Sequence, residues 1–410
     1  MTAAETPSEP GADERWLTPG VRGIGAASLL ADVGHEIPTS LLPSLLTGTL
    51  GAPAAALGII EGVADGLAGG ARFVGGALAD DPQRRRTIAV GGYGATAVLS
   101  GLIGVATSVW QVAILRSSAW AARGLRVPAR NALLADVVPA GAYGRAYGFE
   151  RALDNLGAII GPLLGIVLVA AVGVRSAILL SIIPGLLAVG AIVYAIRAAK
   201  LPRTRARQPI RFQVRPVMRG ELGRLLGAVG AFELGNIAAT LLILRATELL
   251  APGHGTDGSA QLALALYTAY NVAATLTSVP AGRYGDRHSP VRVLVGGSAA
   301  FAAAYLTLGL TGASIALLAI GFVLAGIGIG CVETAEHAAV ARLAPAALRG
   351  SAFGLLATVQ SLGNFVASAT AGLLWTLVSP TAAFVYAGAW MVLAFAAFVA
   401  ASRTPGTHTA

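Results

Sequence analysis

Stretches of about 20 apolar residues recur along this chain between residues 22 and 402, and short polar breaks separate them. A helix of that length crosses the hydrocarbon core of a bilayer. The stretches lack the period-two alternation of a barrel strand, and only helices and closed barrels satisfy their backbone in lipid. The pattern therefore predicts an all-α membrane protein with twelve transmembrane helices. The expected spans are 22–46, 54–79, 87–107, 110–137, 143–171, 174–199, 221–249, 260–284, 290–311, 313–342, 350–377 and 380–402.

The composition supports a membrane protein and excludes several other classes. Charged residues are only 12% of the 410 residues, whereas a soluble protein carries roughly 25%. The net charge of +9 is expected on cytoplasmic loops, so we expect no nucleic-acid partner. Cys331 is the only cysteine, which excludes an internal disulfide and a multi-cysteine metal cluster. We expect no cofactor, and no residue is assigned as a metal ligand.

The loop arginines predict the orientation of the chain. The breaks at 47–53, 107–110, 311–313 and 378–381 contain no lysine or arginine. Because positive residues concentrate on the cytoplasmic side, the arginine-rich breaks are expected to be cytoplasmic, and so are both termini. The first twenty residues lack the basic segment of a signal peptide. The arginine-rich breaks hold Arg84, Arg85, Arg86, Arg145, Arg283, Arg287, Arg292, Arg349 and a run from Arg197 to Arg219.

An internal duplication is visible at one constant offset. The segment from Gly76 to Asp80 recurs from Gly282 to Asp286, and the same offset of 206 residues aligns Asp65 with Asn271 and Tyr147 with Phe353. Each copy begins and ends on the same side, so the sequence predicts two parallel six-helix repeats. The expected parts are a tail at 1–20, a first bundle at 21–199, a basic linker at 200–219, a second bundle at 220–403 and a tail at 404–410.

Charges within the spans are distributed by span number. The third, sixth, ninth and twelfth spans have none except at their ends, whereas the first, second, fourth, fifth, seventh and tenth carry several. A charge at mid-membrane is costly unless it is paired or hydrated. We therefore expect the uncharged spans to face lipid and the charged ones to face a partner or an aqueous cavity.

Three features together resemble the major facilitator superfamily of secondary transporters. They are the repeat, the peripheral position of every third helix, and a loop motif of G-x-x-x-D followed by arginines, which occurs at Gly76–Asp80 and again at Gly282–Asp286. The resemblance covers residues 20–402, although Asp81 stands where the family's loop motif usually has a base. It implies that these loops latch neighbouring helices and release them as the two halves rock. The implied gating residues are Gly76, Asp80, Arg84, Arg85, Gly282, Asp286, Arg287 and Arg292.

A second motif lies in the fifth span. Gly157, Gly161, Pro162 and Gly165 match the G-x-x-x-G-P-x-x-G pattern of the superfamily's antiporters. A helix-packing role is an equal alternative, because small residues let helices approach closely. Several short strings also resemble a poorly characterised bacterial branch of efflux-type members.

The first span offers a candidate proton site. Asp32, His35 and Glu36 share one helix face, so they can share a proton or hold a cation. The alternative is that Arg123 or Arg126 holds the two carboxylates as structural pairs, and Arg123 to Arg130 are otherwise expected to snorkel toward the cytoplasm. The full set proposed for proton coupling or the substrate cavity is Asp32, His35, Glu36, Glu61, Asp65, Arg116, Arg123, Glu233, Asn236, Asn271, Glu333, Glu336 and His337.

The resulting interpretation is a secondary transporter that exports a small molecule in exchange for protons, with the lipid bilayer as its other partner. Alternatives are a divalent-metal or metal-chelate exporter, a proton-independent uniporter or importer, and, less favoured, a non-transporting receptor or scramblase. No nucleotide loop or ordered nucleophile–base set is present, so an enzyme is not expected. Lys200 is the only lysine in an arginine-rich chain, which is typical of a GC-rich bacterial genome. We expect a monomer in the bacterial plasma (inner) membrane.

Overall fold

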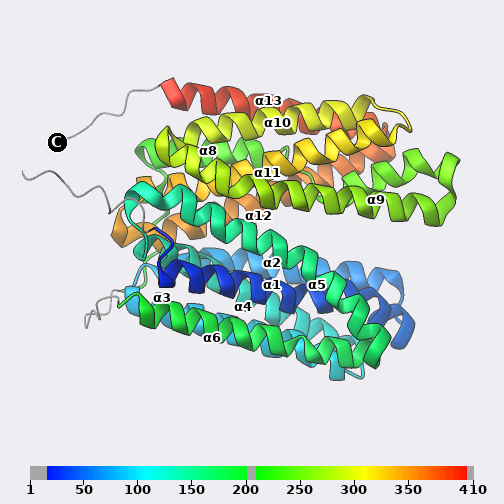
Figure 1. Cartoon of the computed structure of the whole chain (residues 1–410), viewed down its shortest axis with the longest axis horizontal. Helices are drawn as coiled ribbons and strands as arrows, with labels where there is room; N and C mark the ends of the chain where they lie inside the picture. The colour runs from blue at the N-terminus through cyan, green and yellow to red at the C-terminus, as the bar shows by residue number, and fades with distance from the viewer. Residues whose placement is uncertain (1–15, 201–208, 404–410) are drawn as a thin grey trace, which may run out of the picture.

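The computed structural model describes residues 16–200 and 209–403, and the described residues contain helices and turns but no strand (Figure 1). The expected tails at 1–15 and 404–410 and the linker stretch at 201–208 lie outside the described residues. The α-helices are α1 (Pro19–Pro43), α2 (Ala54–Ala79), α3 (Pro82–Leu102), α4 (Val109–Asp136), α5 (Tyr143–Leu180), α6 (Ile182–Ala198), α7 (Val214–Val217), α8 (Gly220–Glu233), α9 (Ala239–Arg287), α10 (Pro290–Leu310), α11 (Ile315–Leu343), α12 (Arg349–Leu377) and α13 (Pro380–Arg403).

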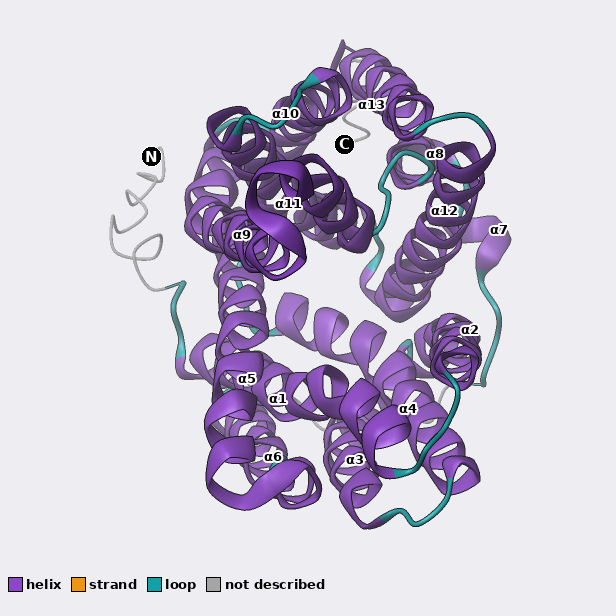
Figure 2. Cartoon of the chain, turned by 90° about the vertical axis from the view of Figure 1, so that its right-hand side faces the viewer, coloured by secondary structure: helices purple, strands orange, loops and turns teal. Residues whose placement is uncertain are grey.

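The helices form two bundles that lie side by side (Figure 2). In the first bundle α1 packs against α5 and α6, while α4 packs against α2 and α3. In the second bundle α11 packs against α9 and α10, while α13 packs against α8, α10 and α12. The bundles touch mainly where α5 meets α9 and where α2 meets α12. An all-helical fold is thus confirmed for the described residues.

Two of the longest helices contain a sharp reversal at a glycine. Gly173 interrupts α5 with φ 78°, and Gly255 interrupts α9 with φ 70°. Residues with a Cβ rarely adopt this left-handed region, so glycine allows the chain to turn back. The reversals fall in the breaks expected at 172–173 and 250–259. The turn in α9 forms one extremity of the molecule in Figure 1.

The helix expected over 221–249 is wrong as a continuous element. Helix α8 ends at Glu233 and α9 begins at Ala239, and the residues between them are not helical. Side chains of α12 bind the freed backbone, because Asn364 donates to the Asn236 carbonyl at 2.7 Å and the Ala238 N–H donates to Ser368 at 2.9 Å. Non-helical backbone at membrane depth is tolerated where the surrounding protein satisfies it in this way.

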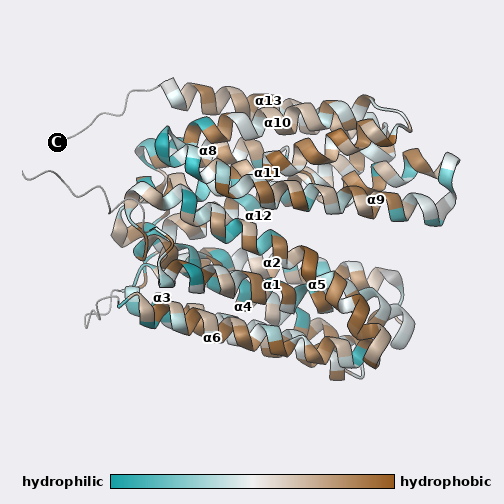
Figure 3. Cartoon of the chain, in the orientation of Figure 1, coloured by the Kyte–Doolittle hydropathy of each residue, from teal (hydrophilic) through white to brown (hydrophobic). Residues whose placement is uncertain are grey.

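The outer surface suits a lipid environment. Seven helices among the described residues are long and apolar enough to cross a membrane. Many large apolar side chains are exposed, including Ile166, Leu276 and Leu373. Hydrophilic residues gather toward the end where α3 and α8 begin, while most of the helix length is hydrophobic (Figure 3). The chain is therefore a multi-pass membrane protein.

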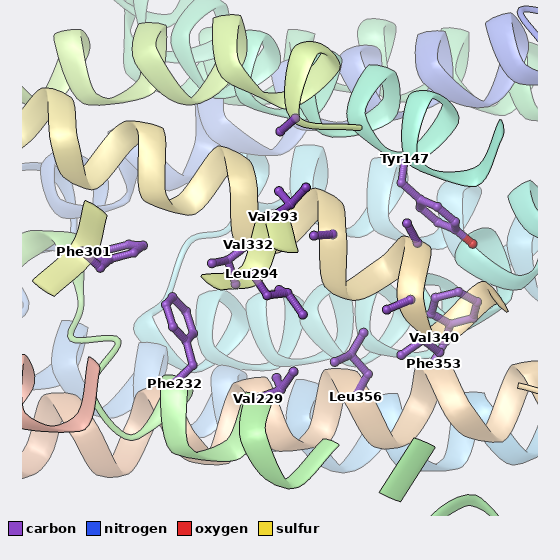
Figure 4. Close-up of a cluster of buried hydrophobic side chains, with 14 of the residues drawn as sticks. Tyr147, Val229, Phe232, Val293, Leu294, Phe301, Val332, Val340, Phe353 and Leu356 are labelled. Carbon is purple, nitrogen blue, oxygen red and sulfur yellow. The ribbon is translucent and has the colours of Figure 1, made fainter. Parts of the chain in front are cut away.

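Aromatic and aliphatic side chains fill the second bundle (Figure 4). Phe232 of α8 meets Phe301 of α10 edge to face, with ring centroids 5.3 Å apart. Tyr147 of the first bundle reaches into this core beside Val340 and Phe353. One apolar core thus continues across the contact between the bundles.

The bundles are in close contact at one end and separate toward the other. We call the close end the basic end, since it holds Arg84, Arg85, Arg287 and Arg292. A Cβ added to Gly76 of α2 would lie 2.7 Å from Gly354 Cα of α12. On the same face of α2, a Cβ on Gly69 would lie 3.7 Å from Ser361, and one on Gly62 would meet nothing within 4 Å. The facing surfaces of α2 and α12 therefore separate away from the basic end.

Candidate functional site

A chain of three titratable side chains runs along α1. His35 Nδ1 lies 3.2 Å from Asp32 Oδ1, and His35 Nε2 lies 3.2 Å from Glu36 Oε1. The side chains of Asp32 and His35 are 7% and 2% exposed, whereas that of Glu36 is 27% exposed. The helical spacing predicted this shared face. The arrangement can carry a proton between a solvent-accessible carboxylate and a buried one through one imidazole.

Helix α4 supplies an arginine to this chain. Arg123 Nη2 lies 3.6 Å from Asp32 Oδ1, so the structural pairing left open from the sequence is present alongside the histidine contact. Arg126 makes no such pair among the described residues, and its guanidinium lies 4.0 Å from the ring centroid of Tyr93. Asp32 is therefore held by one cation and one imidazole at once.

Two acids of α2, Glu61 and Asp65, contact side chains of α4. Glu61 accepts a hydrogen bond from Arg116 at 3.0 Å, and Arg116 also donates to Thr39 Oγ1 at 3.0 Å. Asp65 accepts from the Trp120 indole N–H at 2.9 Å, and the Arg116 guanidinium lies 3.3 Å from the centroid of that indole. Arg116 is thus paired with a carboxylate of α2 and also bonded to α1.

The antiporter-like glycines pack against the charged face of α1. A Cβ on Gly157 would lie 2.8 Å from Asp32 Cβ, and one on Gly161 would lie 2.5 Å from Glu36 Cβ. Pro162 lies within α5, and a Cβ on Gly165 would lie 3.5 Å from Ser40 Oγ. Small residues at this spacing let α5 approach α1 over the titratable chain.

A charge network on α5 was missed from the sequence. Arg130 Nη1 lies 2.8 Å from Glu150 Oε1, Arg151 Nε donates to Glu150 Oε2 at 2.7 Å, and Arg151 Nη1 lies 3.1 Å from Asp154. Arg130 is buried in this network, so the expected snorkelling is wrong for it. The sequence contains a signal for this network, because Glu150, Arg151 and Asp154 are three charges within five residues of an apolar span. Such charges require partners in a membrane.

The polar residues of the second bundle occupy separate positions. Glu233 accepts from Asn236 Nδ2 at 3.0 Å, and Asn271 donates to the Tyr267 carbonyl at 2.9 Å. Glu333 is 3.9 Å from Arg151, which links the two bundles. Glu336 accepts from Gln360 Nε2. These contacts spread the predicted residues over α8, α9 and α11.

His337 and the acids around it are not arranged as metal ligands. His337 Nδ1 lies 2.6 Å from the Glu333 carbonyl. In the part of the chain that the structure describes, no group of three or more His, Cys, Asp or Glu side chains is placed to hold a metal ion. The acidic and histidine residues of α1 and α11 therefore do not form one coordination sphere.

Two aspartates close the basic end at equivalent positions of the repeat. Asp80 accepts hydrogen bonds from the Ser351 N–H and hydroxyl at the start of α12. Asp286 accepts from the N–H groups of Gly144 and Arg145 at the start of α5, at 2.7 and 2.9 Å. Anions are stabilised at helix N-termini. Burial raises the pKa of Asp80, because desolvation outweighs the Ser351 hydrogen bonds.

The remaining gating residues differ in what they contact. Arg85 pairs with Asp136 at the end of α4, and Arg349 of the second bundle reaches the same carboxylate at 3.3 Å. Arg287 and Arg292 are exposed, and Arg84 is half-buried. A Cβ on Gly282 would lie 2.0 Å from the Gly144 carbonyl oxygen, so glycine is needed there.

Asp81, which departs from the family's loop motif, has a local structural role. Its side chain accepts from the N–H groups of Gln83 and Arg84, at 2.8 and 3.1 Å, and thus caps the start of α3. Aspartate is among the preferred residues at this position of a helix. The base usual in the family is replaced here by an N-cap.

Two helical bundles that hold charged side chains within apolar spans are typical of a membrane transporter. A family model described as Major Facilitator Superfamily matches residues 24–247 and again residues 225–409. The chain belongs to the major facilitator superfamily. It is a transporter and not an enzyme, as are the proteins to which it is similar.

Individual relatives agree with this assignment. The chain is 27% identical over 383 residues to an uncharacterised MFS-type transporter of Methanocaldococcus jannaschii, covering 91% of this chain and 92% of that protein. It is 28% identical over 236 residues to the multidrug resistance protein MdtG of Dickeya zeae, covering 54% and 53% of the two chains. A bacterial homologue of the iron transporter ferroportin, solved in an outward-facing state, has the same fold, with a TM-score of 0.74, 14% identity and coverage of 94% and 100%.

Proposed function

We propose that this transporter exports a small molecule in exchange for protons by alternating access. In this proposal its twelve spans form two parallel six-helix repeats, over 21–199 and 220–403, joined by the basic linker. Both termini face the cytoplasm of a bacterium, and a monomer in the inner membrane is the working unit. The arginine-rich loops support this orientation, because positive loops remain on the cytoplasmic side.

The observation that carries proton coupling is the chain Asp32–His35–Glu36. Its inner carboxylate is buried beside Arg123 and its outer one is partly exposed. A proton that enters at Glu36 can pass to His35, which contacts Asp32. The added charge on His35 then changes how strongly Asp32 binds Arg123. Coupling requires such a link between protonation and helix contacts.

The contacts between the bundles support the conformational half of the proposal. The basic end is closed by Asp80 and Asp286, while the faces of α2 and α12 separate toward the opposite end. With the basic end in the cytoplasm, this conformation is outward-facing. Export follows when the region between the bundles loads substrate from the cytoplasm in the opposite conformation. The similarity to a protein named for multidrug resistance supports efflux as the direction.

Everted membrane vesicles with an acid interior test the proposal. A panel of drugs, siderophores and divalent metals is added while an acid-sensitive dye reports proton leakage. We expect one compound class to dequench the dye, and we expect Asp32→Asn, Glu61→Gln and Asp65→Asn to abolish the response. Glu221→Gln is the matched control, because Glu221 is an exposed carboxylate at the start of α8.

Two other outcomes contradict antiport. Uptake of a radiolabelled panel member without any dye response indicates a uniporter. A dye response to a divalent metal alone, retained in all three variants, indicates metal export through a different site.

A further inference from the structure

One carboxylate of the second bundle is fully enclosed. Glu336 of α11 has an exposed fraction of 0%. Its Oε1 accepts a hydrogen bond from Gln360 of α12, and its Oε2 has no hydrogen-bond partner among the described residues. A buried, ionised carboxylate with one free oxygen is strongly disfavoured, and such groups take up a proton instead.

The charges around Glu336 do not compensate its own. Glu233 of α8 and Glu333 of α11 act on it with the same sign, and Arg151 of α5 is the cation that acts on it from the first bundle. Arg151 is already engaged by Glu150 and Asp154 at 2.7 and 3.1 Å. Among the described residues, no lysine or arginine lies within ion-pair distance of Glu336.

His337 engages a different acceptor with the ring nitrogen nearest to Glu336. Its Nδ1 lies 3.8 Å from Glu336 Oε1 but only 2.6 Å from the Glu333 carbonyl oxygen. A ring nitrogen within 2.6 Å of a carbonyl donates its proton there. The acids of the first bundle differ in this respect, because Asp32, Glu61 and Glu150 each lie within 3.6 Å of an arginine nitrogen.

Glu336 lies next to an aromatic seal formed by Tyr147, His337 and Phe353. The ring centroids are 5.7 Å apart for Tyr147 and His337, 5.8 Å for Tyr147 and Phe353, and 6.0 Å for His337 and Phe353. Tyr147 belongs to α5 and the other two to α11 and α12, so the seal joins the two bundles. Glu336 is seven residues from the end of α11 at Leu343, about 10 Å along the helix.

A partly exposed acid lies close to Glu336 on the same helix. The Glu333 side chain, one turn before Glu336 on α11, is 30% exposed. Residues three apart on a helix are neighbours on one face. Glu333 is therefore the neighbouring acid with access to the surface, whereas the aromatic seal lies between Glu336 and the basic-end termini of α5, α11 and α12.

We propose that Glu336 is a second proton-binding site, distinct from the Asp32–His35–Glu36 chain, and that it is loaded in this conformation. The proton resides on Oε2. When the basic end opens, Tyr147 moves away with the first bundle, water reaches Glu336, and the carboxylic acid releases its proton to that side. Two protonation sites on opposite bundles then bind protons in one transport cycle. The role of the site in transport rests on the proposed function, whereas its protonation does not.

Infrared difference spectroscopy of the purified full chain tests the protonation directly. We expect the wild-type spectrum at neutral pH to contain the C=O stretching component of a dehydrated carboxylic acid. Glu336→Gln is expected to remove that component, and Glu221→Gln to leave it unchanged. A component of unchanged intensity in Glu336→Gln, or its absence from the wild type, overturns the proposal.

A second variant provides an independent test in case Glu336→Gln does not fold. Gln360→Leu removes only the hydrogen bond to Oε1, and we expect it to shift the frequency of the same component without removing it. An unshifted component assigns it to another acid and overturns the proposal. Glu233→Gln identifies any C=O stretching component that comes from the neighbouring buried acid Glu233. Such a component must differ in frequency from that of Glu336.

Release of the proton through the basic end is tested by removing the contacts that hold this end closed. Asp80→Asn combined with Asp286→Asn is expected to reduce the Glu336 component at neutral pH, because more molecules then expose Glu336 to water. An unchanged component contradicts release through the basic end. The spectrum needs no substrate, so failure here is distinguishable from failure of proton-coupled export, which the vesicle assay decides.

Discussion

Asp286 at the end of α9 accepts a hydrogen bond from the backbone N–H of Gly144 at the start of α5, across 2.7 Å. The same carboxylate binds Arg145 of the first bundle and Arg342 of its own. One side chain therefore joins the two bundles at the basic end. Asp80 makes the equivalent contact with Ser351 at the other junction.

Asp286→Ala is expected to loosen this junction. A hydrogen bond to a charged group contributes about 1.5–3 kcal/mol, so hydrogen exchange at Gly144 and Arg145 should accelerate by about tenfold or more. Exchange measured by mass spectrometry over residues 143–150 provides the test. Asp257→Ala removes an exposed carboxylate at the other extremity and serves as the control. Equal exchange in the two variants contradicts a latch at Asp286.

Gly76→Ala is expected to force the bundles apart at the basic end. The new methyl group would lie 2.7 Å from Gly354 Cα, which is backbone and has no alternative rotamer. Spin labels at exposed Gln83 and Arg287, in a Cys331→Ser background, should report a longer distance. Gly62→Ala is the matched control on the same helix face, since its methyl group meets nothing within 4 Å. If both substitutions give the wild-type distance, the close approach at Gly76 does not hold the end closed.

Glu150→Gln is expected to destabilise the protein more than Glu36→Gln. Glu150 is buried between Arg130 and Arg151, and its neutralisation leaves two buried guanidinium groups with a weaker partner. Loss of one partner from a buried pair costs about 3–5 kcal/mol. Glu36 is partly exposed and faces an imidazole. Thermal unfolding of both variants in detergent measures the difference, and a lower Tm for Glu36→Gln would reverse the assignment of a structural role to Glu150.

His35→Gln is expected to flatten the pH dependence of transport. Glutamine has a similar length and retains hydrogen-bonding atoms, but it does not take up a proton between about pH 5 and 8, where histidine does. Initial transport rates across that range provide the measurement. His254→Gln is the control, since that histidine bonds the Leu250 carbonyl in the turn region of α9. A profile as steep as the wild type would show that His35 does not mediate coupling.

Much of the helical framework is predictable from local sequence. The expected span 54–79 coincides with α2, and the expected 350–377 differs from α12 by one residue. Apolar length and turn residues such as Gly173 and Gly255 act locally, so a sequence pattern suffices to find them. The break at residues 234–238 was not predictable, because Asn364 and Ser368 of a distant helix stabilise it.

The candidate site was only partly predictable for a related reason. Helical spacing placed Asp32, His35 and Glu36 on one face, which is a property of α1 alone. Arg130 is paired with Glu150 of another helix, Glu336 is bonded by Gln360 of another helix, and Arg151 also reaches Glu333, which is 182 residues away in the chain. Spacing along one helix contains no information about such partners.

Local sequence suffices to establish that the chain is helical, crosses a membrane and carries charge on particular spans, because backbone satisfaction in lipid and helix periodicity depend only on neighbouring residues. Which of these charges are compensated depends on the packing of the helices. Arg130 is paired and Glu336 is not, although both are charged residues within apolar spans. Whether a buried ion has a partner depends on where a second helix places its side chains, and only the packing of the two bundles fixes that.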